Sequence, residues 1–266
     1  MSFTKNHQNL INAKERFEND PRVRKNLSAT MNYLESSIFF SSPIITVDQA
    51  AIVFDLGKGA NINGISINGL TVDEFTALVE SAMLSANTEY GFGKWGEIRD
   101  IYANELFDSI EENSNEKRNI HMGVDVFCQS GEDIFTPLDA RIRIKANNEN
   151  ELDYGPMLIL EHNNHNGGVF YTLYGHLSLQ SIANIEEGQI VKAGQKIAKV
   201  GAPPENGNWP PHLHFQLILD LFDLGADFPG VALSSEKDMW LTLSPCPTMF
   251  FSGANQSINC GSVDKF

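Results

Sequence analysis

Residues 211–217 read PHLHFQL, a short apolar stretch that carries two histidines two positions apart. Side chains at alternate positions of a β-strand point to the same face of the sheet. His212 and His214 are therefore predicted to face one common space. Two neighbouring imidazoles on an apolar strand need partners for their ring nitrogens, and a metal ion serves both. The stretch predicts a strand that carries part of a metal site.

The sequence around this stretch is typical of short strands joined by tight turns. Apolar stretches alternate with clusters of Gly, Asn and Pro, which is the pattern of a turn-rich β structure. The predicted strands are residues 125–127, 142–144, 157–161, 170–174, 189–191, 196–200 and 213–219. We assign this β domain to residues 91–266.

Residues 1–90 are predicted to form a helical N-terminal region of unknown role. Asp20 followed by Pro21 is a favourable helix start, since it joins a capping side chain to a ring with helical φ. Thr71 and Glu74 form a capping box ahead of a helix with one apolar face. The predicted fold class is therefore mainly β with a helical N-terminal region, or α+β overall.

Three further segments carry local signals. A capping box at residues 46–49 predicts a short helix that ends at about Leu56. Two Asn-Gly pairs within residues 62–69 predict a small hairpin. Residues 91–96, GFGKWG, match the pattern GxGxxG, but no strand is predicted before them. A dinucleotide site needs a strand, a turn and a helix, so we predict a loop there.

Composition excludes two classes of function. The formal net charge of −15 argues against nucleic-acid binding, which requires a positive surface. The longest apolar run, Ala50 to Phe54, is too short to span a bilayer. The first 17 residues contain no apolar segment typical of a secretory signal. We therefore expect a cytoplasmic protein, with a cell-envelope location as the alternative.

Basic residues are concentrated at the N-terminus. Residues 1–30 carry six basic and three acidic side chains, whereas the rest of the chain is acidic. We expect these basic side chains mainly to be solvated, as surface charges usually are. Pairing with the acidic body is the alternative.

Two more segments add residues to the predicted metal site. His121 and Asp125 are four positions apart, which on one strand places both on one face. Zinc binds imidazole nitrogen and carboxylate oxygen, and a catalytic zinc site has three protein ligands and a water. His121, Asp125 and one histidine of the pair 212 and 214 fit this set. The other histidine and His176 could move a proton or stabilise an oxyanion.

These segments together resemble a known family, the lysostaphin-type or LytM-type zinc metallo-endopeptidases. That family cuts peptide bonds in the peptidoglycan of the bacterial cell wall, and the resemblance covers about residues 90–250. It rests on IHMGVDVFCQSGEDIFTPLDARI (120–142), LYGHLS (173–178), EGQIVKAGQKIAKVG (187–201) and PHLHFQL (211–217).

The resemblance implies a site and an activity. One zinc ion per chain would be held by His121, Asp125 and His214, while His176 and His212 assist catalysis. The implied fold is an antiparallel β-sheet groove that binds an extended peptide. The implied reaction is hydrolysis by metal-activated water of a peptidoglycan stem or bridge peptide, with glycine or D-alanine beside the cut. The alternative function is a non-catalytic zinc-binding module for peptide recognition or regulation.

Some expectations go beyond the resemblance. The loop at residues 201–209, GAPPENGNW, is bulkier than the Gly/Ser/Thr-rich loop usual in the family, and we expect it to border the groove. Residues 1–90 could cover the groove as an inhibitory segment. His162 and His165 are expected to be solvated at a hairpin tip. The oligomeric state is not predicted.

Overall fold

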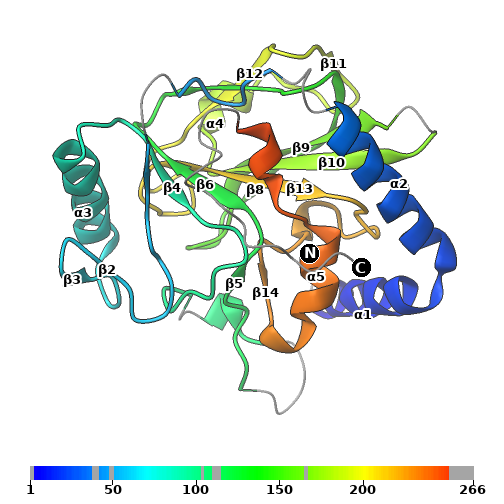
Figure 1. Ribbon diagram of the computed structural model, residues 1–266, viewed down its shortest axis with the longest axis horizontal. Coiled ribbons are helices and arrows are strands. Elements are labelled where there is room, and N and C mark those ends of the chain that lie inside the picture. Colours follow the sequence, from blue (N-terminus) through cyan, green and yellow to red (C-terminus); the bar gives the residue numbers. More distant parts are fainter. Residues whose placement is uncertain are drawn as a thin grey trace.

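The computed structural model describes residues 3–37, 42–47, 51–102, 105–109, 115–164 and 167–251. Its centre is an eight-stranded sheet with the strand order β1-β4-β6-β13-β10-β9-β8-β11 (Figure 1). These strands are β1 (Ile52–Val53), β4 (Gly91–Gly93), β6 (Val124–Phe127), β8 (Ala140–Asn148), β9 (Gly155–Asn163), β10 (Val169–Gly175), β11 (Ile190–Val191) and β13 (His212–Ile218). Neighbouring strands are antiparallel except β1 and β4, which run parallel.

The middle strands of the sheet are buried. Every residue of β13 is buried, and so are the first six residues of β9, GPMLIL. Strands that are covered on both faces carry continuous apolar runs instead of alternating ones, which explains the lack of polar residues in GPMLIL. The two histidines of β13 therefore lie inside the protein and need buried partners.

Smaller elements surround the main sheet. Three antiparallel pairs are formed by β2 (Asn61–Ile62) with β3 (Ile65–Ser66), β5 (Ile120–His121) with β14 (Val231–Ala232), and β7 (Asp133–Phe135) with β12 (Lys196–Lys199). The short helices are α4 (Leu179–Ile182), α5 (Lys237–Leu243) and 3-10 turns at Glu105–Phe107, Gly225–Asp227, Ser234–Glu236 and Pro247–Phe250. The pair of β5 and β14 matters most for the site, because His121 lies in it opposite Val231.

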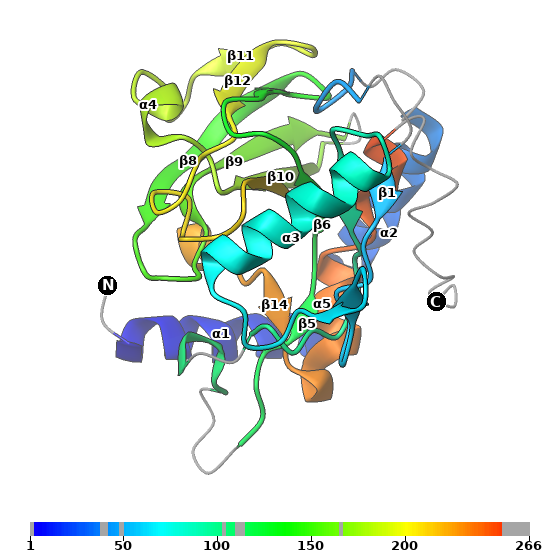
Figure 2. The ribbon, with the colours of Figure 1, turned by 90° about the vertical axis from the view of Figure 1, so that its left-hand side faces the viewer.

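Three longer helices come from the N-terminal part of the chain: α1 (Phe3–Asn19), α2 (Pro21–Ser37) and α3 (Val72–Ser85). Figures 1 and 2 show α1 and α2 along one side of the sheet and α3 along the other. Helix α2 contributes apolar side chains to the main core. Helix α3 forms a second cluster with Phe54 of the preceding loop and Phe127 of β6. Both faces of the sheet region are thus packed by residues from the first third of the chain.

Helix α1 is joined to the body by charge. Lys14 pairs with Glu236, and Arg16 pairs with Asp223 at 3.1 Å between Nη1 and Oδ2. The Arg16 guanidinium also lies 4.9 Å from the centre of the Phe222 ring. Some of the basic side chains near the N-terminus therefore pair with acidic residues of the rest of the chain. This is the alternative that the sequence analysis set beside solvation.

Most of the predicted elements are confirmed. The chain is mainly β, with a largely antiparallel sheet and helices near the N-terminus. Helix α2 begins at Pro21, directly after Asp20, whose Oδ1 accepts from the Arg22 amide at 3.0 Å. Thr71 and Glu74 form the reciprocal capping box of α3. The hairpin of β2 and β3 lies where the Asn-Gly pairs predict it.

Two predictions about local structure are wrong. The short helix expected to reach Leu56 is instead strand β1, because the β-branched residues Ile52 and Val53 pair with β4. Residues 48 and 49 of its predicted capping box, 46–49, lie outside the described residues. The loop expected at residues 91–96 begins with strand β4, which pairs with both β1 and β6. In both cases pairing with distant strands decides the structure.

Two wider expectations stay predictions. One is the division of the chain at residues 90 and 91, although β1 from the first part pairs with β4 from the second. The other is the cytoplasmic location. Among the described residues, no helix is both long and apolar enough to cross a membrane.

Candidate metal centre

Three predicted metal ligands meet at one point. Strands β6 and β13 are paired so that Asp125 lies opposite His214, and His121 ends the neighbouring strand β5. Asp125 Oδ1 lies 3.1 Å from His121 Nε2 and 3.2 Å from His214 Nδ1. The two ring nitrogens are 3.0 Å apart. All three side chains are buried, and together they form a group that could hold a metal ion.

The size of this triangle suits zinc. Ligand atoms at roughly 2.0–2.1 Å from a tetrahedral zinc ion are about 3.3 Å from one another. The three separations of 3.0, 3.1 and 3.2 Å are close to that value. Two nitrogens and one carboxylate oxygen are also ligand types that zinc prefers, and three protein ligands are typical of catalytic zinc sites.

Hydrogen bonds fix which ring nitrogens face the site. His121 Nδ1 lies 3.0 Å from the carbonyl oxygen of Lys94, to which it must donate. His214 Nε2 lies 3.0 Å from Gln216 Oε1 and donates to it in the same way. The lone pairs of His121 Nε2 and His214 Nδ1 are therefore the ones that point at each other. Two lone pairs at this separation repel unless a cation lies between them, so the arrangement fits a bound metal.

Gln216 is itself held in one orientation. Its side-chain nitrogen donates to the carbonyl oxygen of Pro229 at 3.1 Å and to Ser244 Oγ at 2.8 Å. The amide oxygen must then face His214. This second layer of contacts fixes the tautomer of a ligand, as carboxylates or amides commonly do around metal sites.

Gly123 permits the close approach of β13. A Cβ atom at this position would lie 2.6 Å from Cε1 and 2.7 Å from Nε2 of His214. It would also lie 2.8 Å from the carbonyl oxygen of Phe215. A side chain at residue 123 would thus displace a predicted ligand.

The two predicted catalytic histidines lie beside the triangle. The ring centroids of His176 and His212 are 4.3 Å apart. His176 Nδ1 donates to the carbonyl oxygen of Asn206 at 2.8 Å, and His212 Nδ1 donates to that of Pro210 at 2.7 Å. Each ring therefore keeps a lone pair on Nε2, and His212 Nε2 lies 3.7 Å from Asp125 Oδ1. The structure brings all five predicted residues into one site.

Burial controls the charge of these groups. It lowers the pKa of His121 to about 4, and the neighbouring Arg99 acts in the same direction. Burial also lowers the pKa of His176 and His212. For Asp125 burial opposes ionisation, but its interactions with His121 and with the Arg99 guanidinium hold its pKa well below the usual range. Near neutral pH His121 is therefore neutral and Asp125 is ionised, the forms in which these groups bind metal.

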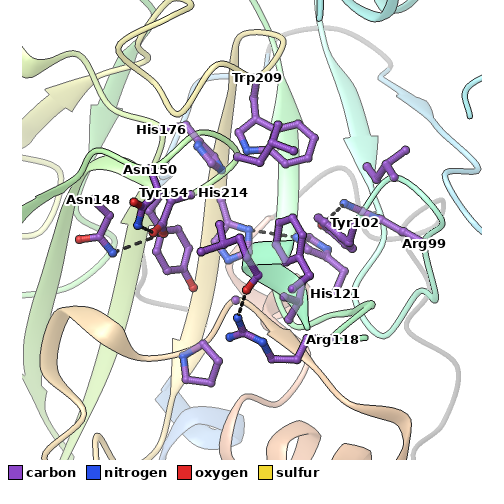
Figure 3. Close-up of a pocket in the computed structure, with 18 of the residues that line it drawn as sticks. Arg99, Tyr102, Arg118, His121, Asn148, Asn150, Tyr154, His176, Trp209 and His214 are labelled. Atoms are coloured by element: carbon purple, nitrogen blue, oxygen red, sulfur yellow. Dashed lines mark hydrogen bonds between the residues drawn. The ribbon is translucent and has the colours of Figure 1, made fainter. Parts of the chain in front are cut away.

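A cavity of about 480 Å³ opens at this site. Figure 3 shows His214 and His121 in its middle, His176 and Trp209 above them, Tyr154 with Asn148 and Asn150 to one side, and Arg118 below. The lining also includes the segment of residues 226–231, which follows β13, and the Ala226 carbonyl oxygen accepts a hydrogen bond from Asn148 Nδ2 at 3.1 Å.

The loop at residues 201–209 borders this cavity, as expected. Trp209 lines it, with its ring centroid 6.4 Å from those of both His176 and His212. On the other side, the Tyr102 ring lies 6.0 Å from Trp209. Asn206 holds the loop through two bonds with the backbone of Trp209, at 2.9 and 3.2 Å. The loop thus both orients His176 and narrows the space beside it.

Phe127 connects the site to the N-terminal part of the chain. Its ring stacks on His212 with a centroid separation of 5.0 Å. The rings of Phe54 and Phe75 pack against Phe127 at 5.4 and 6.4 Å. Leu10, Leu56 and Phe75 also line the cavity. An inhibitory role of residues 1–90 stays a prediction.

One expectation about the other histidines is wrong. His162 is buried, not solvated: it stacks on Phe170, and its Nε2 lies 2.8 Å from Thr172 Oγ1. Its Nδ1 bonds the carbonyl oxygen of Asp139 at 3.1 Å. Strand β9 reaches Asn163, so His162 belongs to the strand and not to its tip. His165 lies outside the described residues.

The sequence analysis missed Arg99, Gln216 and Asn206. Each touches a site residue; Arg99 and Asn206 lie outside the stretches that predict the metal site, and Gln216 lies within PHLHFQL but was assigned no role there. Gln216 is the one that spacing could have found, because it lies two positions after His214 on the same strand face.

Comparison with known proteins identifies one matching family. The sequence model described as Peptidase family M23 matches residues 119–221, a segment that contains all five predicted site residues. A search of curated proteins finds no match.

Solved structures give further similarities. The catalytic domain of the antimicrobial peptidase lysostaphin from Staphylococcus simulans is 28% identical, covers 42% of this chain and 75% of that chain, and has a TM-score of 0.32. A zinc-containing peptidase from Vibrio cholerae is 26% identical, with 43% of this chain covered and a TM-score of 0.29. The present chain spans about a third of the Vibrio chain, 34%. These TM-scores are too low to support conclusions, so the family assignment rests on residues 119–221.

Proposed function

We propose that this protein is a zinc-dependent endopeptidase, a proposal supported by the match of residues 119–221 to the sequence model of peptidase family M23. The observation that carries the proposal is the meeting of three buried donor atoms whose lone pairs face one point. We assign one zinc ion per chain to His121, Asp125 and His214. Zinc bound there would polarise a carbonyl group and make water a nucleophile near neutral pH.

We assign the movement of protons to His176 and His212. Both rings are neutral near pH 7, because burial lowers their pKa, and both keep a lone pair on Nε2. His212 can accept a proton from the attacking water as a general base. That proton must reach the leaving amine, and His176 can receive it at Nε2, stabilise the oxyanion that develops on the scissile carbonyl while it carries the proton, and then pass the proton to the amine.

The proposed substrate is an extended peptide of the peptidoglycan type. Trp209 and Tyr102 approach each other beside the two catalytic histidines, which favours small residues such as glycine or D-alanine next to the cut. A stem or bridge peptide of the bacterial cell wall has this composition. The family assignment is the second support for this choice.

Three variants test the proposal. His214→Ala should lose the zinc that the native chain binds in elemental analysis, because one of three ligands is gone. His212→Ala should keep zinc but lose most turnover of glycyl and D-alanyl peptides. His162→Gln, a buried histidine away from the cavity, should keep both. Zinc-free native protein after zinc dialysis, or a fully active His212→Ala, contradicts the assigned roles.

One observation favours a second function, a non-catalytic zinc-binding module. The Trp209 ring occupies space beside the His176 and His212 rings that a substrate would otherwise use. A module of this kind would bind zinc and retain a peptide without cutting it. Zinc binding together with peptide binding, and intact peptide after long incubation, would support this function over the peptidase.

A further inference from the structure

We propose that Arg99 is a positioning residue of the metal site. Its guanidinium holds the Asp125 carboxylate so that Oδ1 faces His121 and His214 while Oδ2 is occupied elsewhere. The inference rests on the proposed zinc site. Figure 3 shows Arg99 at the edge of the cavity beside Tyr102.

The two terminal nitrogens of Arg99, Nη1 and Nη2, donate hydrogen bonds to groups at the metal site. Nη1 donates to Asp125 Oδ2 at 2.7 Å and to the Tyr102 hydroxyl oxygen at 3.1 Å. Nη2 donates to the carbonyl oxygen of Lys94 at 3.3 Å. That same carbonyl oxygen accepts from His121 Nδ1. One buried guanidinium therefore contacts one metal ligand directly and a second through a shared acceptor.

The third guanidinium nitrogen, Nε, is bound by Glu97. It donates to Glu97 Oε2 at 3.0 Å, and Glu97 Oε1 accepts from the Leu56 amide at 3.1 Å. The Arg99 side chain is only 2% exposed, so it cannot trade these contacts for water. A buried charge with several fixed partners has one favourable position.

Gly93 gives Arg99 the room that this position needs. In β4, Gly93 lies opposite Asp125. A Cβ atom at Gly93 would lie 2.8 Å from Arg99 Nη2 and 3.1 Å from Asp125 Oδ2. The glycine in the GFG segment therefore serves this ion pair and not a dinucleotide.

Lysine cannot replace this arrangement. A guanidinium is a rigid planar fork with donors in several directions, whereas an ammonium group is a single point charge on a flexible stem. The variant Arg99→Lys keeps the positive charge but cannot bond Asp125, Glu97 and the Lys94 carbonyl together. It separates the positioning role from the effect of charge.

The test is the zinc affinity of the full chain, measured by competition with a chelator. Arg99→Lys should bind zinc roughly 10–100-fold more weakly, the usual cost of losing a partner of a metal ligand. The control Arg118→Lys changes another arginine that lines the cavity, but one that bonds the Leu106 carbonyl oxygen and no predicted ligand. Its zinc affinity should equal that of the native chain. Absorption of the cobalt-loaded protein should change with Arg99→Lys only.

The outcomes separate the two proposals. A native chain that binds zinc and an Arg99→Lys variant that binds it equally well overturn the positioning role alone. A native chain that binds no zinc refutes the metal site and the role of Arg99 with it.

A second variant covers the case in which Arg99→Lys does not fold. Glu97→Gln leaves one acceptor oxygen for the two donors, Leu56 N–H and Arg99 Nε–H, and should weaken zinc binding several-fold through Arg99. Unchanged affinity in this variant contradicts the inference.

Discussion

Gly123→Ala should damage the metal site by displacing one ligand. The added Cβ would lie 2.6 Å from Cε1 of the His214 ring, whereas carbon atoms in ordinary contact are about 3.5–4.0 Å apart. The ring would have to move by about 1 Å, because the Phe215 carbonyl oxygen, 2.8 Å away, blocks retreat of the methyl group. The triangle of donors, with sides of 3.0–3.2 Å, would then open at His214.

Two quantities should change together. Forcing a methyl group into a packed site costs about 1–3 kcal/mol of stability, and each kcal/mol corresponds to roughly 2–4 °C in Tm for a chain near this size. Zinc affinity should also fall about tenfold or more, because a ligand loses its orientation. Thermal unfolding of the metal-free protein and chelator competition measure the two effects.

Gly188→Ala is the matched control. Gly188 has φ of +87°, and a Cβ atom added there would have no other atom within 4 Å. Alanine at this position therefore costs about 1–2 kcal/mol of backbone strain without reaching the site. It should lower Tm and leave zinc affinity unchanged. If Gly123→Ala binds zinc as tightly as Gly188→Ala does, the close approach of Gly123 to His214 has no role in the site.

Three other predictions concern the fold and its coupling to the site. Burial lowers the pKa of His162 to about 4, so between about pH 6.5 and pH 4 the unfolded chain binds a proton there that the folded chain does not. Stability should therefore fall as pH falls through this window, and less steeply in His162→Gln, in urea titrations at several pH values. Thr71→Ala should cost about 0.5–2 kcal/mol, because the capping box of α3 loses its hydroxyl acceptor; a loss below this range in urea unfolding would show that the cap contributes little. Phe75→Ala should cost about 3–5 kcal/mol and also reduce turnover, since Phe127 loses a neighbour of the ring that stacks on His212. Leu78→Ala, in the same cluster, should lose stability but keep turnover per folded molecule, and equal turnover losses in both variants would contradict the coupling.

Four of the five predicted site residues could be proposed from the sequence because their spacing is local, whereas the role of His176 comes from the resemblance to the family. Two positions along a strand fix a common face for His212 and His214, and the segment from His121 to Asp125 carries its own spacing. The strands between them also follow from local alternation and turn residues. What sequence spacing left open was which histidine of the pair binds metal; His214 meets His121 and Asp125 in the structure, and its role as a ligand stays a proposal.

The remaining features depend on contacts between distant segments. Arg99 reaches Asp125 only because β4 pairs with β6, and that pairing turns the expected loop at residues 91–96 into a strand. His162 is buried because β10 pairs with β9 as far as Asn163. The turn-like sequence that follows had led to the expectation that the His162 side chain is solvated. The conformational preferences of neighbouring residues do not predict which distant strands pair, so neither contact could be predicted from them.

Phe127 packs against helix α3, which lies outside residues 119–221, the segment matched to the family. Its ring belongs to the cluster formed with α3, and it also supports His212. Substitutions that displace α3 should therefore change the orientation of the His212 imidazole, which we propose to be catalytic, through the Phe127 ring alone. Variation in residues 54 and 75 offers a way to adjust the reaction rate while every residue of the metal site stays the same.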